Sequence, residues 1–213
     1  MTHSFDQAYW DQIWQGDSGA SMSTASPNPY LARELGDLPP GSALDAGCGA
    51  GAEAIWLATR GWRVTAADIA AEALARAAAR ATESGVAERV QWVQADLSTW
   101  EPEAQFDLVT THYAHPAMPQ LEFYDRIASW VAPGGSLLIV GHLHHDGADG
   151  HGHGHGGDGP PAEASATADA ITTRLDPAVW EVVTAEEVDR TMSAHGGREV
   201  VLHDVVVRAS RRH

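Results

Sequence analysis

Cysteines and long apolar runs are scarce in this sequence. Cys48 is the one cysteine among 213 residues, which excludes a disulfide-stapled scaffold and is consistent with a reducing compartment. The longest clear apolar run, Leu137 to Val140, is far shorter than the roughly 18 residues that a membrane helix needs. Residues 1–6 lack a basic stretch followed by an apolar one, so we expect no secretory signal. Together these absences predict a cytoplasmic protein.

Basic residues are also few. Thirteen Lys and Arg stand against 29 Asp and Glu, which gives a formal net charge of −16 when histidine is neutral. A surface this acidic repels phosphate backbones and anionic lipid headgroups, so we expect neither nucleic acids nor membranes as partners. Apolar residues form 44% of the chain and charged residues 20%, which is typical of a globular protein and excludes disorder of the whole chain.

Short apolar strands alternate with helical patterns between residues 42 and 140. We expect strands at 42–46, 62–68, 89–96, 106–111 and 136–140, and helices at 52–60, 71–84 and 118–131. This alternation predicts a doubly wound, Rossmann-like α/β sandwich, because parallel strands are joined by helical crossovers. Residues 180–192 and 199–209 indicate two further strands joined by a turn, which would end the sheet in an antiparallel hairpin.

The flanking segments follow other patterns. Large apolar side chains in residues 5–14 fall on one face of a helix: Phe5, Tyr9, Trp10, Ile13 and Trp14. Residues 16–29 read as a loop, and helices are expected at 30–35 and 163–175. We therefore expect one domain over residues 1–213, in which residues 1–35 form a lid. Residues 144–161 are rich in histidine and glycine and are expected to form a flexible loop insertion.

A glycine-rich turn follows the first expected strand, in the segment Asp45-Ala-Gly-Cys-Gly-Ala-Gly51. Glycine lets the backbone turn sharply and approach a ligand, and the helix that follows offers free amides to a negative group. Gly47, Gly49 and Ala52 also satisfy the dinucleotide fingerprint G-x-G-x-x-A. The turn alone therefore leaves a NAD(P)-dependent oxidoreductase open.

Three aspartates at strand ends favour a different cofactor. Asp45 lies where a carboxylate would repel a pyrophosphate, and it suits a cofactor with a cationic amino-acid part. Asp68 ends the second strand and suits ribose hydroxyls, which both cofactor types carry. Asp96 follows the third strand, where it can accept a hydrogen bond from an adenine amino group while the Leu97 amide meets a ring nitrogen.

The order of several short motifs resembles the class I S-adenosylmethionine-dependent methyltransferases. The matching pieces are Asp45–Gly51, Val64–Ile69, Gln94–Leu97, Phe106–Val109 and Ala132–Leu138. More loosely, Tyr9–Trp14, the Pro27-Asn-Pro29 segment, Ala54–Ala58 and Gly61-Trp62 are similar to the small-molecule branch that includes tellurite-resistance and thiopurine-type methyltransferases. The resemblance implies a seven-stranded sheet with an antiparallel last strand, S-adenosyl-L-methionine as cofactor, and methyl transfer to a small thiol, chalcogen oxyanion, hydroxyl or amine.

Carried over by position, the resemblance also implies a cofactor site. Its members are Asp45, Gly47, Gly49, Gly51, Asp68, Ile69, Asp96, Leu97 and Thr111. The glycines would line the methionine and ribose side, Asp45 would lie near the cofactor's amino group, and Ile69 would pack on adenine. The segment Thr111–His115 would lie beside the transferable methyl group.

Two histidines and one tryptophan are further candidates. His112 and His115 lie just past the fourth expected strand and are candidate general bases, with loop packing as the alternative. Trp14 is a candidate to cover the cofactor, with packing of its helix on the sheet as a compatible alternative.

The histidine-rich tract keeps a second class of function open. His142, His144, His145, His151, His153 and His155 offer imidazoles to divalent metals. No cysteine or fixed ligand spacing supports a structural zinc site, so we expect at most adventitious metal binding there. The alternative is a metal-binding or metal-responsive protein on a methyltransferase-like scaffold. The sequence names neither the methyl acceptor nor the oligomeric state.

Overall fold

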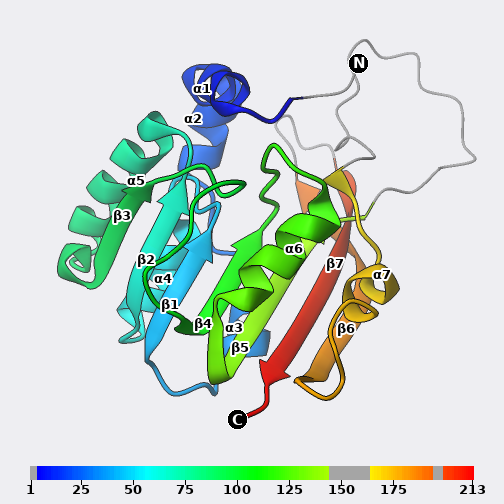
Figure 1. Cartoon of the computed structure of the whole chain (residues 1–213). Coiled ribbons are helices and arrows are strands. Elements are labelled where there is room, and N and C mark those ends of the chain that lie inside the picture. The colour runs from blue at the N-terminus through cyan, green and yellow to red at the C-terminus, as the bar shows by residue number, and fades with distance from the viewer. Residues whose placement is uncertain (1–3, 144–163, 194–198) are drawn as a thin grey trace, which may run out of the picture.

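A single seven-stranded sheet organises the protein (Figure 1). The computed structural model describes residues 4–143, 164–193 and 199–213. The strands are β1 (Ser42–Ala46), β2 (Arg63–Asp68), β3 (Val90–Gln94), β4 (Phe106–His112), β5 (Val131–His142), β6 (Trp180–Ser193) and β7 (Glu199–Arg211). Their order is β3-β2-β1-β4-β5-β7-β6, and β7 is antiparallel to both of its neighbours while the first five strands pair in parallel. The expected mostly parallel sheet with an antiparallel terminal hairpin is confirmed.

Helices cover both faces of this sheet. They are α1 (Gln7–Gln15), α2 (Asp17–Ser23), α3 (Tyr30–Leu35), α4 (Ala52–Thr59), α5 (Ala71–Glu83), the short 3₁₀ turn η1 (Ala87–Arg89), α6 (Gln120–Ser129) and α7 (Ala168–Thr172). Figure 1 shows α6 and α7 in front of the sheet and α3 and α4 behind it. Alternate residues of β5 serve the two layers: Leu138 and Val140 enter the core under α3, α4 and α5, and Leu137 and Ile139 enter the core under α6 and α7.

Three elements differ from the sequence prediction. Residues 17–23 form α2 where a loop was predicted, and Arg76 of α5 stabilises this polar segment by donating to Ser23 Oγ at 2.8 Å. β5 begins at Val131, before the strand predicted at 136–140, because Val131 pairs with Phe106. α7 is shorter than the predicted helix at residues 163–175.

The strand order places a switch point at β1 and β4. From this centre the chain builds β2 and β3 toward one edge and β4 and β5 toward the other. The loops that follow β1 and β4 therefore diverge to opposite faces, and ligands of such sheets bind in the crevice that this divergence leaves at the carboxyl ends of the strands. Among the residues that the structure describes, no helix is long and apolar enough to cross a membrane.

Candidate functional site

The glycine turn after β1 lies at the carboxyl edge of the sheet. Gly47, Gly49 and Gly51 all adopt positive φ values, of 81°, 49° and 74°, which side chains disfavour. A methyl group on Gly47 would collide with the side chain of Ala114, so the loop after β4 rests directly on this turn. A methyl group on Gly51 would instead stand 2.6 Å from the Trp92 ring, which indicates that Gly51 serves helix–strand packing.

Asp68 ends β2 and holds the glycine turn in place. Its Oδ2 accepts a hydrogen bond from the Gly49 amide at 2.8 Å, and its Oδ1 accepts one from the Ala70 amide at 2.9 Å. Burial raises the pKa of this carboxyl group, and the amide hydrogen bonds partly oppose that rise. Each carboxylate oxygen keeps a second lone pair, so Asp68 can still accept hydrogen bonds from a ligand hydroxyl.

Asp45 is the most deeply buried acid of this edge. It is 1% exposed, and its Oδ2 has no hydrogen-bond partner within the described part of the chain. Burial raises the pKa of Asp45 well above its usual range, and the nearby Glu53 carboxylate raises it further. A buried acceptor without a donor is costly, so this oxygen calls for a cationic or protic partner from a ligand.

The third predicted aspartate lies after β3. Oδ1 of Asp96 accepts from the Ser98 amide at 2.9 Å and from the Ser98 hydroxyl at 2.6 Å, which fixes the turn that carries Leu97. Leu97 is buried in the core under α6, and Ile69 is half-buried beside Asp68. The three aspartates thus end or follow the adjacent strands β1, β2 and β3, and none of them takes part in an ion pair among the described residues.

The N-terminal helices cover the glycine turn. Trp14 is 4% exposed, and its ring lies 3.1 Å from where a methyl group on Gly49 would stand. The Trp10 indole donates to the His115 carbonyl oxygen at 3.2 Å, so α1 also contacts the loop after β4. Trp14 therefore lies where a cover would, although contact with a cofactor stays a prediction.

The predicted residues at the end of β4 take different roles in the structure. Thr111 is buried and donates its hydroxyl to the Ala46 carbonyl oxygen at 2.8 Å, which ties β4 to β1. His112 belongs to the strand and leaves its buried Nε2 without a partner among the described residues, and burial lowers its pKa. His115 is buried with Nδ1 3.2 Å from Gln120 Oε1, and burial lowers its pKa as well.

His142 joins this group, which sequence reasoning did not foresee. At the end of β5 its ring lies 4.5 Å from the Tyr113 ring and 5.4 Å from the His115 ring, centroid to centroid. Burial, with a further contribution from the His115 imidazole, lowers the pKa of His142 to about 4. Neutral imidazoles at this edge can accept a proton or a hydrogen bond from a ligand. The signal available in the sequence was its position at the end of an apolar strand.

Neither the surface hollow nor a metal-binding group contributes to this site among the described residues. A hollow of about 450 Å³ is lined by Asp125, Arg174, Trp180 and Arg211, away from the glycine turn, and its Arg174 pairs with Asp125. No group of three histidine, cysteine or acidic side chains is placed to hold a metal ion in the part of the chain that the structure describes. The predicted loop of residues 144–161, and with it most of the histidine tract, lies outside the described residues.

Comparison with known proteins agrees with this geometry. Residues 43–135 match the family described as "Methyltransferase domain". A "Probable thiol methyltransferase 2" of Arabidopsis thaliana is 29% identical over 136 residues, which cover 61% of this chain and 59% of the relative. A "Trans-aconitate 2-methyltransferase" of Streptomyces avermitilis is 34% identical over 121 residues, which cover 53% and 44%. The chain thus spans about half the length of these relatives.

A solved structure shows the same fold along nearly the whole chain. The N-methyltransferase NodS of Bradyrhizobium japonicum, in complex with S-adenosyl-L-homocysteine, superposes with a TM-score of 0.62 and 18% identity, and the match covers 95% of this chain and 91% of NodS. Residues 43–135 are thus similar to the methyltransferase domain family, and the strand order of the sheet agrees with that similarity.

Proposed function

We propose that the protein transfers a methyl group from S-adenosyl-L-methionine to a small-molecule acceptor. The observation that carries this proposal is the set of three aspartates, Asp45, Asp68 and Asp96, which lie at the ends of adjacent strands and pair with no arginine among the described residues. Such an edge attracts a cationic ligand and repels a pyrophosphate. The unpartnered Oδ2 of Asp45 is the specific feature that a cofactor with an ammonium group fits.

Each residue of this edge would contact or support a different part of the cofactor. Asp68 would hold the ribose hydroxyls, Asp96 and the Leu97 amide would bind the adenine edge, and Ile69 would pack on the ring. Asp45 would face the amino group, with Gly47 and Gly49 keeping the backbone close. Gly51 would support this turn through its packing, and Thr111 would do so by fixing the end of β4. Bound there, the cofactor supplies a methyl group on a positively charged sulfur.

The chain then has to align an acceptor and exclude water. We propose that residues 1–35 act as the lid of one domain, since Trp14 packs on the glycine turn and Trp10 on the loop after β4. His112 and His115 remain the candidate bases for a protic acceptor, and His142, whose pKa burial lowers to about 4, would serve as a hydrogen-bond acceptor beside them. We further propose a cytoplasmic location, where the thiol of Cys48 stays reduced.

Calorimetry with S-adenosyl-L-homocysteine and NAD, side by side, tests the cofactor assignment. We expect binding of S-adenosyl-L-homocysteine and none of NAD, and the reverse result would overturn the proposal. For the acceptor, release of S-adenosyl-L-homocysteine is measured with thiols, hydrosulfide, thiocyanate, selenite, tellurite, phenols, amines and trans-aconitate. Cofactor binding without turnover of any small molecule in this panel would count against a small-molecule acceptor.

A further inference from the structure

Tyr113, the first residue after β4, has a backbone conformation that its residue type disfavours. Its φ is 55°, in the left-handed region where a bulky aromatic residue is a rare outlier. Such a conformation persists only where the surroundings fix it, and it is typical of functional sites. The amide of Tyr113 still donates to the Val140 carbonyl oxygen at 2.9 Å, so the residue remains tied to β5.

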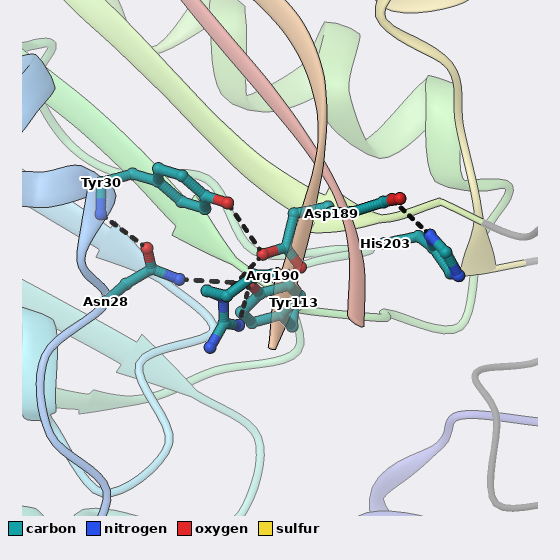
Figure 2. A network of polar contacts seen from close by, with 7 residues as sticks. Asn28, Tyr30, Tyr113, Asp189, Arg190 and His203 are labelled. Atoms are coloured by element: carbon teal, nitrogen blue, oxygen red, sulfur yellow. Dashed lines mark hydrogen bonds and ion pairs between the residues drawn. The ribbon is translucent and has the colours of Figure 1, made fainter. Parts of the chain in front are cut away.

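The Tyr113 hydroxyl is the centre of a partly buried polar network (Figure 2). It donates to Asp204 Oδ1 at 2.9 Å, and it accepts from the Arg190 guanidinium at 3.0 Å and from the Asn28 amide at 3.3 Å. A phenol has one donor and two acceptor positions, so every position of this hydroxyl is filled. Asp204 is 0% exposed, and its Oδ2 also accepts from Arg190 and from the Tyr30 hydroxyl.

The network joins distant parts of the chain. Asn28 precedes α3, Arg190 lies on β6 and Asp204 lies on β7, so the terminal hairpin reaches the loop after β4. Residues 190 and 204 lie outside the stretch 43–135 that matches the methyltransferase domain. An arginine–aspartate pair whose carboxylate is fully buried is weak evidence for stability, because apolar residues of similar volume serve a fold as well. The placement of this pair therefore points to a role beyond holding the hairpin.

The residue after Tyr113 provides the link to the glycine turn. The Ala114 methyl group lies so close to Gly47 that no side chain fits between them. The Ala114 carbonyl oxygen accepts from the Gln120 side chain at 3.0 Å, which fixes the far end of this short loop. The phenol therefore holds one end of a segment whose middle rests on the turn that the proposed function assigns to the cofactor.

We propose that Tyr113 is a positioning residue. Its hydroxyl, held by Asp204 and Arg190 of the terminal hairpin, places Ala114 against Gly47 and so fixes the glycine turn. This inference rests on the proposed function, because it takes the glycine turn as part of the cofactor site. The hairpin, which contributes no predicted cofactor ligand, thereby becomes part of the binding machinery.

Two matched substitutions test this role. Tyr113→Phe and Tyr30→Phe each remove one hydroxyl that donates to Asp204, at different oxygens. Tyr30 lies on α3, and within the described part of the chain its hydroxyl has no hydrogen bond to the loop after β4. Calorimetry with S-adenosyl-L-homocysteine should show at least fivefold weaker binding for Tyr113→Phe and a change within twofold for Tyr30→Phe. Urea denaturation of both variants provides the comparison of stability. Equal weakening in the two variants, or a change within twofold for Tyr113→Phe, would overturn the proposal.

A second readout separates this inference from the proposed function. If the unaltered protein does not bind S-adenosyl-L-homocysteine, the proposed function fails, and the amide resonances of Gly47 and Ala114 decide the positioning role. We expect both resonances to shift in Tyr113→Phe and to stay in place in Tyr30→Phe. Unmoved resonances in Tyr113→Phe would contradict the role whatever the cofactor.

Discussion

At the scale of residues, the carboxyl edge of the sheet is arranged at the expense of stability. Among the described residues, one carboxylate oxygen of the buried Asp45 has no hydrogen-bond partner, and neither has the buried Nε2 of His112. Groups of this kind are rare in proteins because desolvation is not offset by a hydrogen bond. Their concentration beside the glycine turn is expected where a ligand supplies the missing partners.

Replacing Asp45 with Asn should stabilise the free protein at neutral pH. The pKa of Asp45 is raised on folding, so the folded state binds this proton more tightly than the unfolded state. The stability that Asp45 contributes is therefore full below the unfolded pKa of about 3.9 and falls as pH rises through the folded pKa. In thermal denaturation, the melting temperature of Asp45→Asn should rise relative to that of the unaltered protein as the pH increases from 4 to 8. A constant difference over this range would contradict the assigned pKa direction.

Replacing Asp68 with Ala should weaken cofactor binding. The change removes the acceptor for the Gly49 amide and the proposed acceptor for the ribose, which costs about 1–3 kcal/mol. Calorimetry with S-adenosyl-L-homocysteine measures the loss, and Asp37→Ala, in an exposed turn before β1, is the control. Affinities that match in the two variants would remove Asp68 from the site.

The positions of the aspartates and glycines at the strand ends were predictable, because strand ends and glycine spacing are local signals. His142 was not, because its neighbours Tyr113 and His115 come from another strand and loop. The unpartnered state of Asp45 and the strain at Tyr113 were also beyond sequence reasoning. Both arise from contacts between segments far apart in the chain.

At the scale of elements, α5 fastens the N-terminal helices over the glycine turn. Arg76 donates to the Trp14 carbonyl oxygen at 3.1 Å. Arg80, one helical turn later, donates to the carbonyl oxygens of Ala50 and Ala25, each at 2.9 Å. These contacts explain why the polar segment 17–23 is helical although its own sequence favoured a loop. Helix α5 itself was predicted well, because its periodic alanines and its end at Gly85 are local features.

Replacing Arg80 with Ala should loosen this cover. Because Arg80 joins the N-terminal segment to the glycine turn, limited proteolysis should cut residues 5–25 several-fold faster in the variant. Arg89→Ala removes an exposed arginine that donates to the Gly61 carbonyl oxygen at 3.3 Å, and it should leave the cleavage rate unchanged. Equal cleavage in both variants would show that Arg80 does not fasten the lid.

At the scale of the whole molecule, charge and topology act together. The doubly wound order was predictable from the alternation of patterns, and so was the terminal hairpin. The contact of this hairpin with the carboxyl edge of the sheet, through Arg190 and Asp204, was not predictable, because β7 inserts between β5 and β6. The net charge of −16 predicts a field around the proposed site that favours a cationic ligand and disfavours polyanions.

This charge should make solubility depend on pH. Protonation of all 12 histidines would bring the net charge from −16 to −16 + 12 = −4, so repulsion between molecules weakens on acidification. Burial lowers the pKa of His112, His115 and His142, so these three gain their protons only at lower pH. Light scattering should report rising self-association from pH 7.5 to pH 5. Scattering that stays constant over this range would argue against charge as the source of solubility.

A crystal structure with S-adenosyl-L-homocysteine tests the central claim most directly. The account predicts that the thioether nucleoside occupies the crevice between the loops after β1 and β4. Its ribose hydroxyls should lie within hydrogen-bond distance of Asp68, its adenine at Asp96 and its ammonium group at Asp45. An empty crevice at saturating ligand, or a pyrophosphate-bridged molecule bound in its place, would contradict the account.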